Sequence, residues 1–223
     1  MLKNQISPSI LSANFLNLSL QLDLLKTEKI KNLHIDVMDG HFVKNLTFGI
    51  PIIKAIKTQF PNFILETHLM VKEPEKFLDM FMPFSDVIIF HYEATSFQEN
   101  IIKKLKSFNK KIGISIKPKT SSDEIYPFLN FIDMILIMTV EPGFAGQTYI
   151  KEMNEKIYNL KNYISSKNLN LDISVDGGID EKTIFLAKEN GANSFVIGSK
   201  LFNNDLKIMQ KNIKNFKNIL DME

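Results

Sequence analysis

Short apolar runs alternate with stretches of helical periodicity along this whole chain. We expect strands at residues 6–11, 33–38, 64–71, 86–92, 111–117, 134–140, 172–176 and 193–197. Helical stretches are expected at about residues 14–28, 50–59, 97–108, 122–130, 151–166, 181–190 and 205–220, and one more opens at Glu73 and Pro74. The helix at 14–28 is predicted to carry Leu16, Leu20 and Leu24 on one apolar face.

This alternation predicts the fold. Strands that alternate with helices pair in parallel, so eight such units indicate an α/β protein built as a single (β/α)8 TIM barrel. A doubly wound open sheet is the competing arrangement. It is disfavoured because the first strand–helix turn lacks a GxGxxG fingerprint, and polar residues accumulate at strand ends all round the chain. With no linker or low-complexity segment, residues 1–223 are predicted to form one domain.

Composition excludes several classes of function. The chain has no Cys, so disulfides and thiolate metal sites are ruled out. Its 27 positive residues are all Lys and are spread along the sequence, which argues against nucleic acid as the main partner. The segment MLKNQISPSI lacks the apolar core of a signal peptide, and the longest apolar run, 134–140, is too short to cross a bilayer. We therefore expect a cytoplasmic protein with no membrane partner.

The stretch 33–49, LHIDVMDGHFVKNLTFG, carries the most informative polar residues. In a strand, His34, Asp36 and Met38 share one face, and Leu33 shares the other with further apolar residues. The length and flanks suggest a strand covered on both sides. A buried His and Asp two residues apart need a polar partner, and a metal ion or a substrate would serve.

Other strands end in residues of the same kinds: His68 and Met70 on the third, His91 on the fourth and Asp176 on the seventh. Barrel strands present their carboxyl ends on one face. His34, Asp36, His68 and Asp176 are therefore expected to converge, and two imidazoles with two carboxylates suit a divalent transition metal. For His91 and His41, an ordinary hydrogen-bonded role has equal weight, and the methionines near the strand tops are either core filler or an apolar cavity wall.

Glycine-rich loops follow three neighbouring strands. The segment 139–147, TVEPGFAGQ, holds Gly143 and Gly146, and the last two strands lead into Gly177–Gly178 and Gly198–Ser199. Loops after the seventh and eighth barrel strands commonly bind phosphate through backbone N–H groups. Because the chain has no Arg, a bidentate guanidinium clamp is excluded, and phosphate would have to be held by backbone N–H groups, hydroxyls or Lys.

These motifs together resemble a known family, the ribulose-phosphate 3-epimerases, with the closely similar allulose-6-phosphate 3-epimerases beside them. The resemblance runs in family order through SPSILSANF, HIDVMDGHFVKNLTFG, THLMV, FHYEA, MTVEPGFAGQ, VDGG and GSKLF, and so spans nearly the whole chain. Three positions depart from the family pattern: Asn14 where Asp is common, Lys44 where Pro is usual and Lys119 where Gly is frequent. None of the three belongs to the expected metal set.

The resemblance implies a set of roles. His34, Asp36, His68 and Asp176 would bind one divalent metal ion, and Asp36 and Asp176 would also be the acid–base pair. Substrate contacts would come from Ser9, Met38, His68, Met70, Met138, Gly143, Phe144, Ala145, Gly146, Asp176, Gly177, Gly178, Gly198 and Ser199. Family members usually self-associate, so a homo-oligomer is expected. The ligand types suit Zn, Fe(II), Mn or Co equally.

The expected reaction is metal-dependent inversion at C3 of a ketose phosphate, converting D-ribulose 5-phosphate to D-xylulose 5-phosphate. Inversion next to a ketone needs one group to remove a proton and another to return one on the opposite face. D-Allulose 6-phosphate is the alternative substrate, since GFAGQ replaces the GFGGQ of many pentulose enzymes. A transferase or decarboxylase acting on a phosphorylated substrate, and a non-catalytic sugar-phosphate binder, remain as further alternatives.

Overall fold

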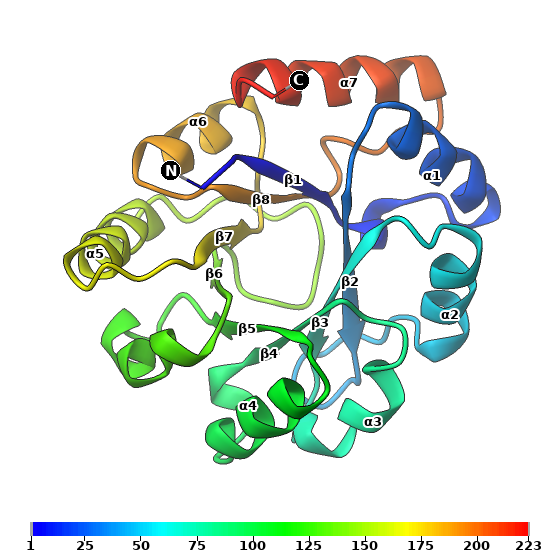
Figure 1. Cartoon of the computed structure of the whole chain (residues 1–223). Helices are drawn as coiled ribbons and strands as arrows, with labels where there is room; N and C mark the ends of the chain where they lie inside the picture. The colour runs from blue at the N-terminus through cyan, green and yellow to red at the C-terminus, as the bar shows by residue number, and fades with distance from the viewer. Residues whose placement is uncertain (1, 223) are drawn as a thin grey trace.

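The computed structural model describes residues 2–222, and its eight parallel strands form one sheet. Their order is β1-β8-β7-β6-β5-β4-β3-β2, and a bridge between Ser9 and His34 brings the ends of this order together into a nearly closed barrel (Figure 1). The predicted barrel is confirmed. The strands are β1 (Gln5–Pro8), β2 (Asn32–Met38), β3 (Ile64–Met70), β4 (Val87–His91), β5 (Lys111–Ile116), β6 (Met134–Met138), β7 (Asp172–Asp176) and β8 (Ser194–Ile197).

An outer ring of helices surrounds the strands (Figure 1). Its α-helices are α1 (Leu18–Thr27), α2 (Ile50–Gln59), α3 (Leu78–Phe81), α4 (Gln98–Ser107), α5 (Met153–Ser166), α6 (Glu181–Glu189) and α7 (Leu206–Ile219). Within residues 2–222, no helix is both long and apolar enough to span a membrane.

Several predicted boundaries are wrong, each for a local reason. The first strand ends at Pro8 and is followed by a 3-10 turn, Ile10–Ser12, where Ser9 accepts a hydrogen bond from the backbone of Leu11. The element between β5 and β6 is a 3-10 helix, Ser122–Phe131, and it contains Pro127, which has no amide hydrogen to continue an α-helix. The third helix likewise opens as a 3-10 turn, Pro74–Lys76, before α3.

Of the three residues on the predicted apolar face of the first helix, Leu24 packs against the core, but the other two do not. Leu16 is 94% exposed and Leu20 is 55% exposed, whereas Leu22 and Leu25 are buried in the core. Leu16 belongs to a separate 3-10 turn, Phe15–Asn17, and α1 begins only at Leu18. A 3-10 turn advances three residues per turn, so the helical phase read across this junction from sequence was shifted.

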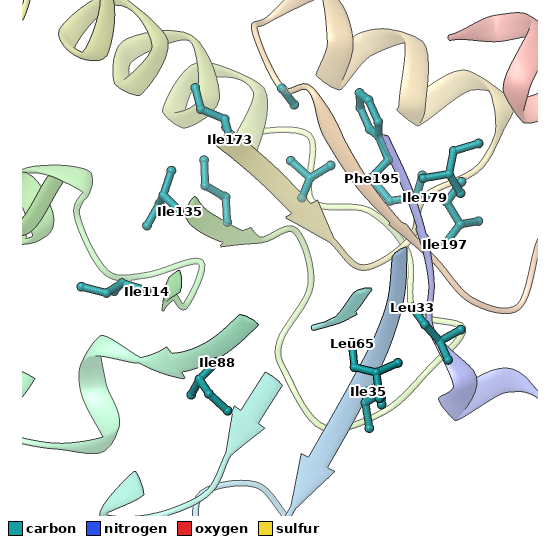
Figure 2. Close-up of a cluster of buried hydrophobic side chains, with 14 of the residues drawn as sticks. Leu33, Ile35, Leu65, Ile88, Ile114, Ile135, Ile173, Ile179, Phe195 and Ile197 are labelled. Carbon is teal, nitrogen blue, oxygen red and sulfur yellow. The ribbon is translucent and has the colours of Figure 1, made fainter. Parts of the chain in front are cut away.

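The core has two layers that the strands separate. Outward-facing strand residues such as Leu33, Ile35 and Ile88 pack against the helices (Figure 2). The residues between them point into the barrel. A second apolar cluster fills the barrel interior: Val87, Ile89, Met134, Leu136, Met138, Val140 and Val196. Every residue of β2 is buried, as predicted for a strand covered on both sides.

Candidate active site

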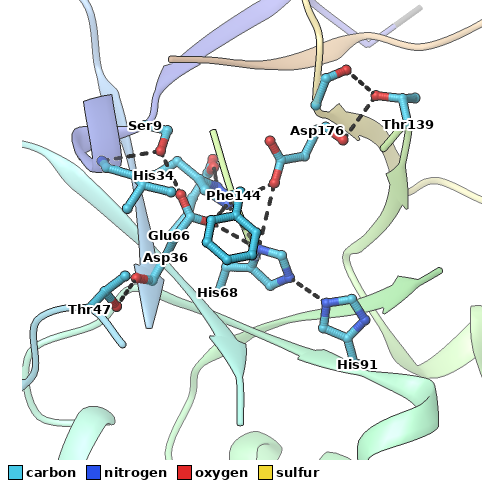
Figure 3. Close-up of polar contacts among 12 residues, drawn as sticks. Ser9, His34, Asp36, Thr47, Glu66, His68, His91, Thr139, Phe144 and Asp176 are labelled. Carbon is cyan, nitrogen blue, oxygen red and sulfur yellow. Dashed lines mark hydrogen bonds and ion pairs between the residues drawn. The ribbon is translucent and has the colours of Figure 1, made fainter. Parts of the chain in front are cut away.

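Four polar side chains meet at the carboxyl end of the barrel (Figure 3). His34 and Asp36 come from β2, His68 from β3 and Asp176 from β7, and one ligand atom of each lies within 4.8 Å of the other three. Asp36 Oδ1 lies 3.2 Å from His68 Nδ1 and 3.4 Å from His34 Nε2, and Asp176 Oδ2 lies 3.8 Å and 4.0 Å from the same nitrogens. The expected convergence is therefore present in the structure.

A carboxylate contacts the ring nitrogen of His34 that faces away from the cluster. Its Nδ1 lies 3.4 Å from Glu66 Oε2, and Glu66 Oε1 accepts a hydrogen bond of 2.7 Å from Asn32 Nδ2. A carboxylate accepts, so Nδ1 carries a proton and Nε2 faces the cluster, where it offers a lone pair once the ring is neutral. Sequence reasoning did not single out Glu66. Glu66 lies two residues before His68, so both side chains are on the inward face of β3.

The other two histidines, His91 and His41, differ in burial and in their contacts. His91 is fully buried, and its Nε2 lies 2.9 Å from His68 Nε2 (Figure 3). His41 is 77% exposed at its side chain, and its Nδ1 contacts the carbonyl of Asp39 at 2.9 Å. For each of them the sequence left an ordinary hydrogen-bonded role and a functional role equally weighted, and the structure places His91, but not His41, beside the cluster.

Two hydroxyl groups orient Asp36. Ser9 Oγ donates a hydrogen bond of 2.5 Å to Asp36 Oδ2. Thr47 Oγ1 donates to the backbone carbonyl of Asp36 at 2.6 Å and accepts from the backbone of Met38 at 3.0 Å, which ties the loop before α2 to the end of β2. Ser9, expected only as a substrate contact, thus also contacts a cluster carboxylate.

The two aspartates have opposite electrostatic surroundings. Burial favours the neutral form of both. For Asp36, the charge and hydrogen bond of the neighbouring His34 outweigh burial and hold the pKa well below its ordinary value. For Asp176, the negative charge of Asp36 adds to burial, and together they raise the pKa to about 7. At neutral pH one carboxyl group of the pair is therefore ionised, while the other readily holds a proton.

The histidines also differ. Burial lowers the pKa of His34, but the carboxylates of Asp36, Glu66 and Asp176 outweigh it and raise the pKa well above its ordinary value. Burial and the neighbouring imidazoles lower the pKa of His68 to about 3, although Asp36 opposes this. His68 is therefore neutral, as a metal-binding imidazole must be.

The donor set fits a divalent cation. Asp36 and Asp176 offer carboxylate oxygens, and His34 offers the lone pair of Nε2, so several acceptor atoms face one another in a buried space. Acceptors this close repel each other unless a proton or a cation lies between them. The raised pKa of His34 indicates that without a cation a proton takes that place. Imidazole and carboxylate ligands together suit a divalent transition metal.

A cavity of about 370 Å³ opens above the cluster. Asp36 and Asp176 line it, whereas His34 and His68 are fully buried. The other residues expected to contact substrate all line it: Ser9, Met38, Met70, Met138, Gly143, Phe144, Ala145, Gly146, Gly177, Gly178, Gly198 and Ser199. Sequence reasoning missed Ser12, Tyr149, Lys151, Asp180 and Lys200, which also line the cavity.

The glycines after β7 permit a close backbone approach. Gly178 has φ +65°, and a Cβ there would lie 2.5 Å from the backbone nitrogen of Tyr149. Gly177 has φ +115°, and its Cβ would lie 2.3 Å from Val140 Cγ2. Thr139 joins the two loops, since its hydroxyl lies 2.9 Å from the carbonyl of Asp176 and 2.5 Å from that of Gly177. Only glycine therefore allows the loops after β6 and β7 to lie this close.

Replacing Gly178 with Ala is expected to lower the free energy of unfolding by about 1–3 kcal/mol, because the new Cβ meets fixed backbone in a left-handed conformation. Denaturant titration of the purified variant measures this loss. Gly49→Ala is the matched control, since Gly49 has φ −119° and a Cβ added there would meet no atom within 4 Å. Equal stabilities for the two variants would contradict the steric argument.

Comparison with known proteins identifies the family. A sequence model of the ribulose-phosphate 3 epimerase family matches residues 5–202. The chain belongs to this family. A ribulose-phosphate 3-epimerase from Eremothecium gossypii is 39% identical over 91% of this chain and 87% of its own length. One from Methanocaldococcus jannaschii is also 39% identical, over 94% of this chain and 89% of its own length.

Two solved structures that share the barrel are more distant in sequence than these two epimerases. A 3-keto-L-gulonate-6-phosphate decarboxylase from Vibrio cholerae has a TM-score of 0.71 and 14% identity, covering 99% of this chain and 98% of its own. A 3-hexulose-6-phosphate synthase from Salmonella typhimurium has a TM-score of 0.70 and 14% identity, covering 97% and 98%. At this identity the likeness shows the fold alone.

The three departures from the epimerase pattern lie away from the cluster. Lys44 and Lys119 are exposed. Asn14 caps the 3-10 turn Phe15–Asn17, where its side chain accepts a hydrogen bond from the backbone of Leu16. Asn and Asp side chains can both make this cap, so the departure at position 14 does not require a different turn.

Proposed function

We propose that this epimerase-family chain interconverts D-ribulose 5-phosphate and D-xylulose 5-phosphate by inverting C3, with residues 1–223 acting as one catalytic domain. The observation that carries this proposal is the aspartate pair. Asp36 and Asp176 reach one cavity from β2 and β7, and their surroundings shift their pKa values in opposite directions. Two carboxyl groups that differ in this way supply a base and an acid at the same pH.

In the forward direction Asp36, ionised, removes the proton from C3, and the electron pair of the broken C–H bond enters a C2–C3 double bond as charge moves to the C2 oxygen. Asp176, protonated, then delivers a proton to the opposite face of C3. The reverse reaction exchanges the two roles. Ser9 holds Asp36 in place through its hydrogen bond to Oδ2, so the base is oriented before substrate arrives.

One divalent ion would be held by His34, Asp36, His68 and Asp176, and it would supply positive charge beside the developing enediolate oxygens. Zn, Fe(II), Mn and Co all fit these ligand types. Met38, Met70 and Met138 line the same cavity and present an apolar surface to the reacting carbon.

Phosphate binding is assigned to the loops with left-handed glycines. Gly143, Gly146, Gly177 and Gly178 all have positive φ, and with Gly198–Ser199 they line the cavity. This geometry supports phosphate binding because backbone amides without side chains can approach an anion closely. Lys200 directly follows Ser199 and lines the cavity too, so it is placed to supply positive charge in a chain without Arg.

Metal affinity is expected to fall as pH falls below about 7. Asp176 and His34 both have raised pKa values in the metal-free cluster, so a metal must displace protons from them at lower pH. Each displaced proton weakens apparent binding by about tenfold per pH unit. Titration of the metal-free protein with Zn²⁺ at about pH 6 and about pH 8 measures this. The same slope is expected in His41→Asn, and a pH-independent affinity in the parent protein would contradict the assignment.

The activity itself is tested with the metal-loaded protein on D-ribulose 5-phosphate and D-allulose 6-phosphate in parallel, with a chelator control. Higher kcat/KM on the pentulose supports the proposal. The reverse preference would assign the hexulose, a possibility raised by Ala145, which lines the cavity where many pentulose enzymes have Gly. Activity on neither would favour the decarboxylase, transferase or binder alternatives.

We also propose a cytoplasmic homo-oligomer. A 38% identical rice relative is named a cytoplasmic isoform. Self-association is supported by large apolar side chains that are exposed on the loops before α1 and α2 and on α1 itself, namely Phe15, Leu16, Leu20 and Leu46. Phe15 packs on Phe48 with ring centroids 5.3 Å apart, which joins the two loops. Sedimentation of the parent and of Leu16→Ser tests this, because a monomeric parent would refute it.

A further inference from the structure

A chain of contacts runs outward from the cluster through residues that the proposed mechanism does not use. His68 Nε2 lies 2.9 Å from His91 Nε2, and His91 Nδ1 lies 3.3 Å from Glu93 Oε2. Glu93 Oε1 accepts a hydrogen bond of 2.7 Å from the backbone of Lys117 and another from the Thr120 hydroxyl. Both histidines are fully buried, so bulk water does not compete for their ring nitrogens.

The outermost carboxylate in this series of contacts, Glu93, determines which ring nitrogens carry protons. Glu93 accepts on both oxygens, so His91 carries its proton on Nδ1. A neutral His91 then has a bare Nε2, which accepts from His68, so His68 carries its proton on Nε2. His68 Nδ1 is left as a lone pair, and it lies 3.2 Å from Asp36 Oδ1 within the cluster.

We propose that Glu93, acting through His91, is a positioning residue that fixes the tautomer of His68 and turns its Nδ1 lone pair toward the metal. This inference rests on the metal site of the proposed function. Glu93 touches neither metal nor substrate in this role. If His91 carried its proton on Nε2 instead, that proton would face the Nε2 proton of His68 and repel it. The two rings must therefore change tautomer together.

Neighbouring side chains pack against the two histidines of this series of contacts. The planes of His68 and His91 are 26° apart, so an N–H of one ring can lie near the plane of the other. The Phe42 ring packs on His91 at a centroid distance of 4.8 Å, and the Lys117 ammonium lies 3.9 Å from the centroid of Phe42. These contacts restrict rotation of the His91 ring.

The loop that anchors Glu93 is itself fixed from α5. Lys156 Nζ donates hydrogen bonds of 2.6 Å to the carbonyls of both Pro118 and Thr120. His34 has the same kind of support in a shorter form, since Glu66 contacts it directly at 3.4 Å. Both imidazoles of the cluster therefore have an outer carboxylate that determines which nitrogen is free.

The first test reads the tautomers directly. Long-range ¹H–¹⁵N correlation spectra of the metal-free, ¹⁵N-histidine-labelled full chain report which ring nitrogen of each histidine is protonated. We expect Nδ1–H for His91 and Nε2–H for His68. A proton on Nε2 of His91, or on Nδ1 of His68, would overturn the proposal, and this measurement needs no variant.

The second test removes the carboxylate. Glu93→Ala is expected to weaken Zn²⁺ binding by about tenfold to a hundredfold in calorimetric titration and to abolish the single tautomer of His91. Glu124→Ala is the matched control, because Glu124 accepts from the neighbouring Tyr92 hydroxyl at 2.9 Å and is exposed outside the chain of contacts. Its Zn²⁺ affinity should equal that of the parent protein. Unchanged affinity in Glu93→Ala would refute the proposal.

Neither test uses a sugar phosphate, so the two hypotheses can fail separately. If the tautomers and Zn²⁺ affinities are as expected but D-ribulose 5-phosphate is not turned over, the proposed substrate is wrong and the positioning role stands. If turnover is normal but His68 has the opposite tautomer, the positioning role is wrong and the proposed function stands.

Discussion

Replacing either Asp36 or Asp176 with Asn is expected to abolish epimerisation, with kcat lowered by about 10³-fold or more. Each carboxyl group is assigned one proton transfer at C3, and such a group contributes about 10²–10⁴-fold to a rate. Asn cannot accept or deliver that proton. Both aspartates also belong to the proposed metal site, so each substitution would remove a negatively charged ligand and add to the effect.

Solvent exchange separates the two roles of these aspartates. In D₂O, an enzyme that has lost only one base can still exchange the C3 proton of one epimer, without inversion, through the remaining base. Metal content is measured in the same samples. Asp180→Asn is the matched control, because Asp180 lines the same cavity but caps α6, and Asn can cap a helix equally well. Near-normal epimerase activity in Asp36→Asn or Asp176→Asn would remove that residue from the acid–base role.

Removing the phosphate from the substrate is expected to lower kcat/KM by about 10³-fold or more, which corresponds to about 4 kcal/mol of transition-state stabilisation. The proposed phosphate loops lie on the β6, β7 and β8 side of the cavity, and contacts there would position C3 between the two aspartates. Binding energy from a part of the substrate that does not react is used to orient the part that does.

Steady-state assays on D-ribulose 5-phosphate and free D-ribulose measure this preference. Lys200→Ala provides a second reading, since it should raise KM for the phosphorylated sugar and leave the rate on the free sugar unchanged. Tyr158→Ala, on an exposed position of α5 that is not among the cavity residues, is the control. Comparable kcat/KM values on the two sugars would contradict the phosphate assignment.

Much of the fold and of the candidate site could be predicted because it depends on two short-range regularities. Side chains alternate along a strand, so Leu33 and Ile35 had to face opposite to His34 and Asp36. Parallel barrel strands end on one face, so polar residues at the ends of β2, β3 and β7 were expected to meet. The structure brings one atom of each within 4.8 Å of the others.

The 3-10 elements could not be predicted in the same way. The period of an apolar pattern does not show where a 3-10 turn passes into an α-helix, so the phase of Leu16 relative to α1 was wrong. The element that contains Pro127 had the composition of a helix, but its hydrogen-bond pattern was decided by the missing amide hydrogen.

The sequence by itself determined the barrel and the four residues of the cluster, because strand alternation and strand ends are local properties, and its motifs and their order indicated the family. Only the tertiary structure showed that Glu66 supports His34, that Glu93 reaches His68 through His91, and that the pKa values of the two aspartates diverge. These features depend on distances between side chains of different strands and on burial. Neither quantity is encoded in the spacing of residues along the chain.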